Sequence, residues 1–158
     1  MPVVTHPGPS APPAPAVRLE IPDGWQPQPS GDALLRAAGS GAGGDAVEIA
    51  VRHLTGDPAL GSAVLVEDST SQVAGGAGQV EEPFVVEIGG REWHARNVSW
   101  DEDGTPVVEV HLATTLDPTD VVSRHVLAVG RARGAGLDAD YDALQAVLES
   151  LVVEEVRG

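Results

Sequence analysis

The chain has 158 residues, which suits one domain of ordinary size rather than two. Apolar residues make up 42% of it and aromatic residues only 3%, so a core is expected but must be aliphatic. Twenty-four acidic residues against nine arginines, with no lysine, give a net charge of −15 spread over the whole length. This negative charge argues against nucleic acid and anionic lipid as partners, because both would repel it. Two interpretations of the charge remain: it keeps the protein soluble, or it also attracts a basic protein partner.

The cysteine content, the length of the apolar runs and the N-terminal residues exclude further kinds of site and segment. There is no cysteine, which excludes disulfides, thiolate metal sites and lipid attachment to sulfur in these residues. No apolar run reaches the ~18–20 residues that cross a bilayer, so membrane insertion is not expected. Residues 1–16 hold six prolines and lack the pattern of a secretory signal, so they are predicted to be a disordered arm. One folded domain is expected over 17–156, with a cytoplasmic location.

The first part of the folded region is predicted to hold short strands and one helix. Apolar residues alternate with polar ones over 17–21 and over 47–51, and Leu34-Leu35 marks another short strand. Asp57-Pro58 places an N-cap acid before a proline at the first helical position, which predicts a helix over 58–73.

Residues 84–114 predict three consecutive antiparallel strands. Two glycines, Gly89-Gly90, suit a type I′ hairpin turn, which requires positive φ at both positions and pairs Val86 with Trp93. If residues 101–104 form the next loop, Trp93 faces Leu112. Both turns then select the same apolar side of the sheet, and a slip of one residue would bring polar side chains onto it.

The opposite side of these strands is mixed in character. The same registers place His94 across from His111 and Arg96 across from Glu109. The two histidines, with Glu109 or His125 as a third ligand, could hold a metal ion. The alternatives are a packed polar patch and a pH-sensitive surface.

The end of the chain is predicted to form a strand, a helix and a short extension. The strand, over roughly 121–130, is apolar on both sides and is expected to be buried on both. Asp138 is expected to cap the helix. A single apolar stripe follows from the spacing of Tyr141, Leu144, Val147, Leu148 and Leu151. Residues 152–156 continue as a short terminal extension.

Motifs that carry catalysis or cofactor binding are missing from the sequence. There is no GxSxG, no HExxH and no phosphate-binding loop with lysine. The glycines of 39–44 match a dinucleotide fingerprint in letters, but a strand follows them where that motif needs a helix. Asp101-x-Asp103-Gly104 fits a hairpin turn, because the remaining ligands of a calcium loop are absent. No catalytic residue, cofactor or metal is therefore predicted, and the chain is not expected to be an enzyme.

Trp25 and Trp100 are interpreted either as edge packing or as anchors for a partner. They lie next to predicted turns, at the margins of the mixed side of the sheet. The candidate partner-binding surface accordingly comprises Trp25, His94, Arg96, Trp100, Glu109 and His111.

Three short segments of the sequence resemble the PsbP-like superfamily, nearest to its LpqN-type bacterial proteins. They are Leu-Glu-Ile-Pro-Asp-Gly-Trp over 19–25, His-Leu-Thr-Gly-Asp-Pro over 53–58 and Leu-Glu-Ser-Leu-Val-Val over 148–153. The resemblance covers about 17–153. It implies an α+β fold, with an antiparallel β-sheet meander packed with helices in an α/β/α sandwich. LpqN-type proteins are usually exported lipoproteins acylated on a cysteine, which this sequence lacks.

The resemblance also implies a function. Members of the superfamily act as accessory subunits, adaptors or chaperones and share no catalytic motif. A non-enzymatic accessory or adaptor protein that binds another protein, in a secretion or assembly system, is therefore expected. Two alternatives remain open: a small-molecule or metal-binding protein that uses the His94/His111 face, and a structural subunit tethered by the N-terminal arm.

Overall fold

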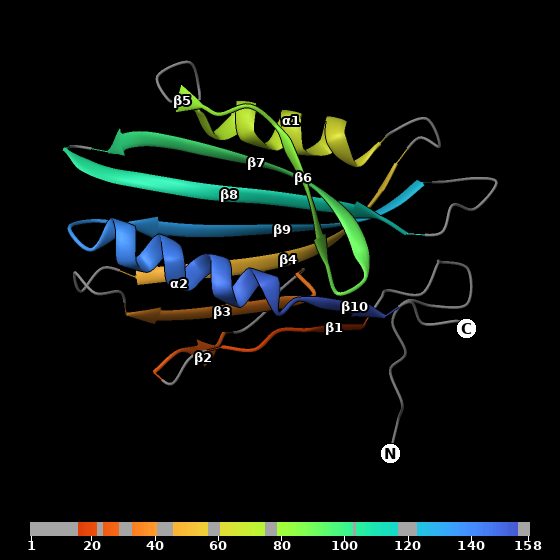
Figure 1. The fold of residues 1–158 in the computed structure, drawn as a ribbon, viewed down its shortest axis with the longest axis horizontal. Helices are drawn as coiled ribbons and strands as arrows, with labels where there is room; N and C mark the ends of the chain where they lie inside the picture. The colour runs from red at the N-terminus through yellow and green to blue at the C-terminus, as the bar shows by residue number, and fades with distance from the viewer. Residues whose placement is uncertain are drawn as a thin grey trace.

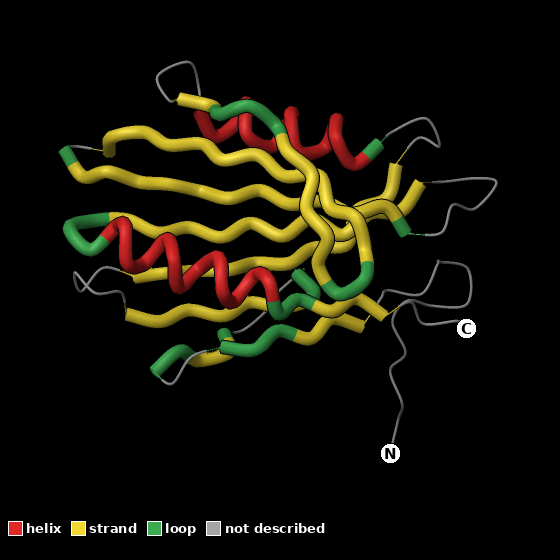
Figure 2. Tube along the Cα trace, viewed as in Figure 1, coloured by secondary structure: helices red, strands yellow, loops and turns green. Residues whose placement is uncertain are grey.

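Figures 1 and 2 show a long antiparallel sheet with helices packed against it. The computed structural model describes residues 16–21, 24–28, 33–40, 46–56, 61–74, 79–102, 104–116 and 123–154. The arm predicted over 1–16 lies outside these ranges except for Ala16, as do Asp57-Pro58 and most of the glycine-rich turn at 39–44.

The main sheet follows the order β2-β3-β4-β9-β8-β7-β5, and β6 also pairs with β7. Its strands are β2 (Gln26–Pro27), β3 (Leu35–Ser40), β4 (Ala46–Gly56), β5 (Gln79–Val80), β6 (Phe84–Ile88), β7 (Arg91–Glu102), β8 (Thr105–Thr115) and β9 (Ser123–Arg133). A separate two-stranded sheet pairs β1 (Ala16–Arg18) with β10 (Val152–Glu154), and the helices are α1 (Ser62–Ala74) and α2 (Leu137–Glu149). The predicted α+β class, with a mostly antiparallel sheet, is confirmed.

The first predicted hairpin is confirmed residue by residue. Val86 pairs with Trp93, and the turn glycines Gly89 and Gly90 have φ of 59° and 78°. The backbone needs left-handed conformations at both positions, which glycine adopts without steric cost.

The register predicted for the second hairpin is wrong by two residues. Glu102 pairs with Thr105, so the loop is shorter than expected, and Leu112 lies opposite Ala95 rather than Trp93. Because side chains alternate with a period of two, the error leaves every side chain on its predicted face. Trp93 and Leu112 still belong to one buried core.

The boundaries of several elements differ from their predictions. Only residues 17 and 18 of the strand predicted over 17–21 are in a strand, which is β1 and pairs with β10. The helix predicted from residue 58 begins at Ser62. Asp138 does not cap α2: Gly136 occupies the N-cap without a side-chain hydrogen bond, and Asp138 lies in the first turn, where its charge favours the helix dipole.

The two helices contact opposite faces of the sheet. Leu144 of α2 packs on Gly130 of β9, within the large core formed with Val110 and Leu112. On the other face, Val66 of α1 packs with Ala113 and Leu127, which are cross-strand partners. The α2 face is thus a broad apolar core, whereas the α1 face has only a small apolar cluster.

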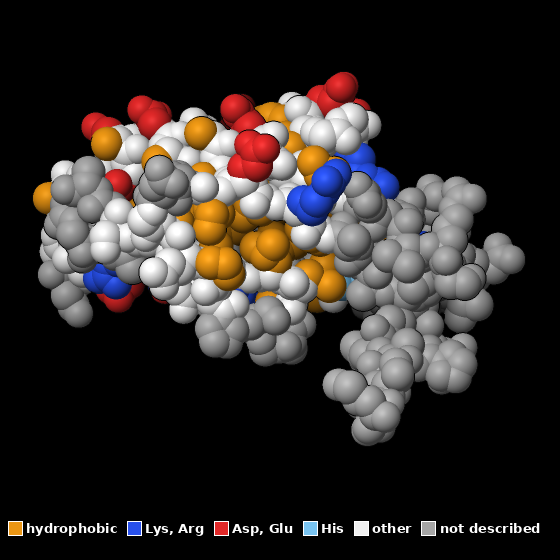
Figure 3. Space-filling view, turned by 90° about the horizontal axis from the view of Figure 1, so that it is seen from below, with side chains coloured by type: hydrophobic (Ala, Val, Ile, Leu, Met, Phe, Trp, Pro, Cys, Tyr) orange, Lys and Arg blue, Asp and Glu red, His pale blue; other side chains and the backbone are white. Residues whose placement is uncertain are grey.

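The outer surface carries apolar and charged groups in separate places. Figure 3 shows apolar side chains gathered in the middle of one face and acidic side chains along its edge. Phe84 and Val85 are among the large apolar side chains that remain exposed. Within the described part of the chain, no helix is long and apolar enough to span a membrane.

Gly130 tests the close approach of α2 to the sheet. A Cβ at this position would lie 2.7 Å from Leu144 Cδ1, so Gly130→Ala must displace the helix or the leucine. We expect it to lower the free energy of unfolding by about 1–3 kcal/mol in urea denaturation. Gly61→Ala is the matched control, since a Cβ there meets nothing within 4 Å. Equal stability of the two variants would contradict this packing.

Candidate functional site

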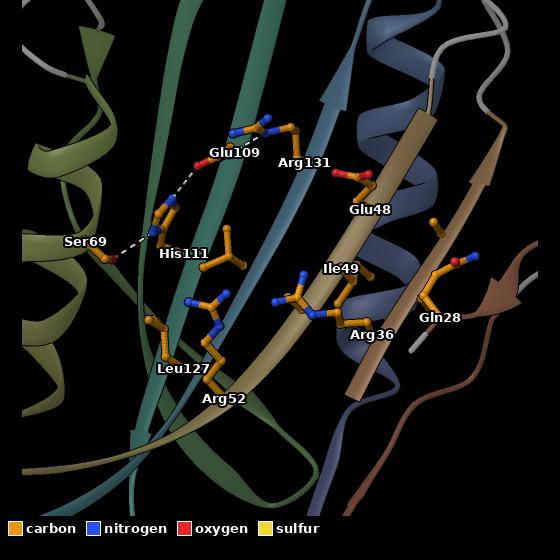
Figure 4. Close-up of a pocket in the computed structure, with 14 residues that line it drawn as sticks. Gln28, Arg36, Glu48, Ile49, Arg52, Ser69, Glu109, His111, Leu127 and Arg131 are labelled. Carbon is orange, nitrogen blue, oxygen red and sulfur yellow. Dashed lines mark hydrogen bonds and ion pairs between the residues drawn. The ribbon is translucent and has the colours of Figure 1, made fainter. Parts of the chain in front are cut away.

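An open recess occupies the α1 face of the sheet. α1 lies along β7 and β8 and makes few contacts with β9, so α1 does not cover the part of this face formed by β9, β4 and β3. The uncovered part is hollowed into a recess of about 850 Å³ (Figure 4). We call it the α1-face recess. Its principal polar lining is Gln28, Arg36, Glu48, Arg52, Ser69, Glu109, His111 and Arg131.

Strand register arranges the charged residues of the recess in rows across the sheet. Arg131 of β9 pairs with Glu109 of β8 on one side and with Glu48 of β4 on the other. The next row runs from His111 through Val129 and Ala50 to Arg36, and the row after it joins Leu127 to Arg52. Both carboxylates of the recess therefore flank Arg131, while Arg36 and Arg52 stand over an apolar part of its floor.

A chain of hydrogen bonds crosses the side of the recess next to α1 (Figure 4). Ser69 Oγ lies 2.7 Å from His111 Nδ1, and His111 Nε2 lies 2.9 Å from Glu109 Oε1. Arg131 Nε donates to Glu109 Oε2 at 2.5 Å, and its guanidinium lies 5.6 Å from the centroid of the Trp100 ring, a cation–π contact. His111 and Glu109 are almost completely buried, so this network holds the floor of the recess in place and does not lie on its exposed rim.

The charge of Glu109 sets the proton positions in the network. Burial alone raises the pKa of Glu109, but the hydrogen bonds from His111 and Arg131, with their charges, outweigh it and hold the pKa below its ordinary value. An ionised carboxylate only accepts hydrogen bonds, so Nε2 of His111 donates. In the neutral ring Nδ1 then accepts, and the Ser69 hydroxyl donates to it.

Serine, histidine and a carboxylate in sequence form the kind of chain that activates a nucleophile. Two features weaken that role here. Ser69 meets Nδ1 and the acid meets Nε2, which reverses the usual use of the ring nitrogens. Arg131 also binds the Glu109 carboxylate, and this reduces the ability of the carboxylate to stabilise an imidazolium. The network is better suited to holding the floor of the recess rigid.

The structure places the six predicted surface residues in three locations. Glu109, His111 and Trp100 belong to the network or contact it through Arg131. His94 and Arg96 line a separate recess of about 190 Å³ bordered by α1, where Arg96 Nε donates to the Glu81 carbonyl at 2.8 Å. Trp25 packs against the large core on the α2 side, close to Gly39.

The predicted cross-strand pairs on this face are wrong. His94 lies opposite Ala113, Arg96 lies opposite His111, and Glu109 lies opposite Val98, as the two-residue shift of the hairpin requires. The His94/His111 metal site therefore lacks its expected geometry, and His125 Nδ1 is engaged by Ser62 and Thr115 at 3.2 and 3.1 Å. Among the described residues no group of three or more metal-ligating side chains occurs.

Sequence reasoning missed Ser69, Arg36, Arg52 and Arg131. The alternation along β4 already put Arg52 on the polar side with Glu48, which was a usable signal. No local signal placed Arg36 beside them, because that depends on the pairing of β3 with β4. Ser69 lies on a helix whose position over β8 is set by packing rather than by spacing.

No family model and no curated protein matches the chain. Among solved structures, LpqN of Mycobacterium tuberculosis, described as involved in cell envelope biogenesis, superposes with a TM-score of 0.71. The match covers 96% of this chain and 88% of LpqN, at 16% sequence identity.

This chain has an LpqN-like fold. The sequence resemblance to LpqN-type proteins is confirmed at the level of the fold. Identity of 16% supports no transfer of residue roles, so the chemistry of the recess rests on this chain's own side chains.

Glu109→Gln tests the buried network. The amide cannot accept two charge-assisted hydrogen bonds as the carboxylate does, so we expect a loss of about 2 kcal/mol in the free energy of unfolding at neutral pH. Because the folded-state pKa of Glu109 is lowered, its contribution is present above the unfolded pKa and fades as pH falls through the folded pKa. The difference between wild type and variant, followed by urea unfolding, should therefore shrink in acid.

The matched control for this prediction is Glu48→Gln. Glu48 is exposed and lies on the other side of Arg131, so its loss should change stability by less than about 0.5 kcal/mol. A Glu109→Gln variant as stable as Glu48→Gln at neutral pH would show that the buried carboxylate does not organise this face.

Proposed function

We propose that this chain is a non-enzymatic accessory or adaptor protein, associated with envelope assembly, that binds its partner through the α1-face recess. The observation that carries the proposal is the recess itself: a hollow of about 850 Å³ whose polar floor is fixed by a buried network. Ligand sites of proteins are concavities of this size with a few well-placed polar groups. Fixed side chains lose little entropy on binding, which favours recognition of a partner.

The fold likeness supports the context of this proposal. LpqN is described as involved in cell envelope biogenesis, and a related assembly role is proposed here for a chain of similar fold. We also propose the PsbP-like sandwich arrangement, supported by the contacts of α1 and α2 with opposite faces of the sheet. The partner is proposed to be a protein, whose basic groups would complement the net charge of −15 of the whole chain.

Site-specific photo-crosslinking in the organism that encodes the chain tests the proposal. A benzophenone side chain at Gln28, on the exposed rim of the recess, should crosslink to one partner band. The same group at Asp142, exposed on α2, is the matched control and should give no such band. Crosslinks of equal yield from both positions, or none from Gln28, would contradict binding at this site.

The Ser69–His111–Glu109 chain provides a separate test of the non-enzymatic part of the proposal. A hydrolase would cleave activated esters such as 4-nitrophenyl acetate and butyrate, and Ser69→Ala would abolish the activity. We expect wild type, Ser69→Ala and Glu109→Gln, at equal concentrations in the same buffer, to release 4-nitrophenol at the same rate. Saturable turnover by wild type that disappears in Ser69→Ala would overturn this part.

A further inference from the structure

A second hollow lies on the α2 face of the sheet, opposite the α1-face recess. It has a volume of about 390 Å³ and is bordered by β6 on one side and by the C-terminal half of α2 on the other. Figure 1 shows β6 approaching the C-terminal end of α2. We call this hollow the β6–α2 groove. Its lining includes Phe84, Val86 and Glu87 of β6, Val110 and Leu112 of β8, and Leu148 of α2.

We infer that the β6–α2 groove binds an extended segment of a partner protein, which adds to the outer edge of β6 as a further strand. The segment directs apolar side chains into the groove and basic side chains away from it. This inference goes beyond the proposed function, because the groove and the α1-face recess lie on opposite faces of the sheet.

The hairpin uses only one backbone edge of β6. Its two-residue turn makes Ile88 and Arg91 a hydrogen-bonded pair, and bonded and non-bonded pairs alternate along an antiparallel ladder. The even-numbered residues of β6 therefore bond to β7, whereas the N–H and C=O groups of Val85 and Glu87 point away from it. Among the described strands, β7 alone pairs with β6.

The outer edge of β6 is open to solvent. Val85 is 53% exposed, which is high for a large apolar side chain in a strand, and Glu87 is exposed as well. α2 makes its main contacts with β9 and β8, so the helix does not cover this edge. An exposed strand edge presents a row of backbone donors and acceptors that another chain can pair with.

The groove gives an added strand room along β6. At the turn it is bounded by the chain after α2, because a Cβ on Gly89 would lie 2.9 Å from the carbonyl oxygen of Leu151. Exposure then rises along the strand, from 7% at Ile88 to 38% at Phe84. An open edge beside an apolar hollow suits strand addition, in which backbone hydrogen bonds supply affinity and pockets for alternate side chains supply specificity.

Alternation decides which side chains of the segment enter the groove. Val86 lines the groove, and so does the floor formed by Val110 and Leu112, which are nearly buried. A side chain of the added strand directly across from Val86 lies on the same face, over this floor. That side chain is therefore expected to be apolar.

The outward face of the β6 hairpin selects the charge of the segment. Glu87 lies directly opposite Glu92, both are exposed, and like charges in this position destabilise a hairpin. The residue of the added strand across from Glu87 lies on the same outward face, so a lysine or arginine there relieves the repulsion. The net charge of −15 of the whole chain also attracts a basic segment.

The experiment compares two N-methylated peptides on ¹⁵N-labelled full-length protein. Both are as long as β6, have capped ends and alternate lysine with valine, and both carry the same number of N-methyl groups. Lysines across from Val85 and Glu87 direct their N–H groups at β6, whereas the valines between them direct theirs away. N-methylation of the lysines thus removes the hydrogen bonds to β6, and N-methylation of the valines preserves them.

The readout is amide hydrogen exchange at Val85 and Glu87, because strand addition protects these outward N–H groups and unspecific charge attraction does not. With the valine-methylated peptide at about 10 mM and a dissociation constant of about 1 mM, about a tenth of the protein stays free, so exchange should slow by about tenfold. The lysine-methylated peptide should slow it by less than about twofold.

A proline variant tests the same edge from the side of the protein. Val85→Pro removes the outward N–H without removing a hydrogen bond to β7, and proline is found at such positions of edge strands. It should weaken binding of the valine-methylated peptide, followed by amide shifts of β6, by about fivefold. Val85→Thr retains the N–H and is the matched control, with an affinity within about twofold of wild type.

A charge variant tests the basic character of the segment. Glu87→Gln should weaken binding of the valine-methylated peptide by about threefold, as expected for an exposed ion pair. Asp68→Asn makes the same change of charge at an exposed position of α1, on the opposite face of the sheet, and should leave the affinity unchanged. Equal weakening by both variants contradicts a basic residue across from Glu87.

The comparison of the two peptides uses wild type alone, so a misfolded variant does not affect it. Equal protection by both peptides, or none by the valine-methylated one, overturns the inference. Protection of Val85 without peptide also overturns it: the occupant is a second copy if protection rises with protein concentration, and another segment of this chain if it does not. Neither crosslinking position, Gln28 or Asp142, lines the groove, so the proposed function is tested separately.

Discussion

The alternation of side chains along β8 is the constraint on which the rest of the structure depends. Val110 and Leu112 face the α2 core, whereas Glu109 and His111 face the recess. One strand therefore supplies part of the apolar core and the polar floor of the site at once. A slip of one residue would bury the Glu109 carboxylate and the His111 imidazole among aliphatic side chains, without hydrogen-bond partners. The free-energy penalty of burying these groups unpaired exceeds the stabilisation from the contacts of a misaligned strand.

Burial of Glu109 links this constraint to the proposed function. Removal of a carboxylate from water is unfavourable, and here the hydrogen bonds of His111 and Arg131 offset the cost. Arg131 is thereby committed to Glu109. The same contacts make the floor rigid before a ligand arrives, so binding loses little side-chain entropy.

Parts of this architecture were predictable from sequence where local chemistry admits one answer. The turn at Gly89-Gly90 fixed its register because two glycines with positive φ leave room for a two-residue loop alone. Residues 101–104 admit loops of two or four residues. The prediction of four residues is wrong, because Glu102 pairs with Thr105. The faces survived that error because an even shift preserves alternation, but the cross-strand pairs, and the metal site built on them, did not.

The recess itself was beyond prediction from the sequence. Apart from Gln28, the lining residues named above come from β3, β4, β8, β9 and α1, and they meet because the sheet order places β9 between β4 and β8. Sequence spacing predicts neighbours along a hairpin, whereas this order results from pairing of strands distant in the chain, such as β4 with β9. Ser69 reaches His111 across 42 positions of sequence, and no motif records that contact.

The most direct measurement of the central claim is the protonation pattern of the His111 ring, read by long-range ¹H–¹⁵N correlation at neutral pH. The account predicts that Nε2 carries a proton, held by Glu109. Glu109→Gln should disturb this pattern, and Glu48→Gln should leave it intact. A ring protonated at Nδ1 alone, or one averaging freely between tautomers as an exposed histidine does, would contradict a recess floor fixed by this network.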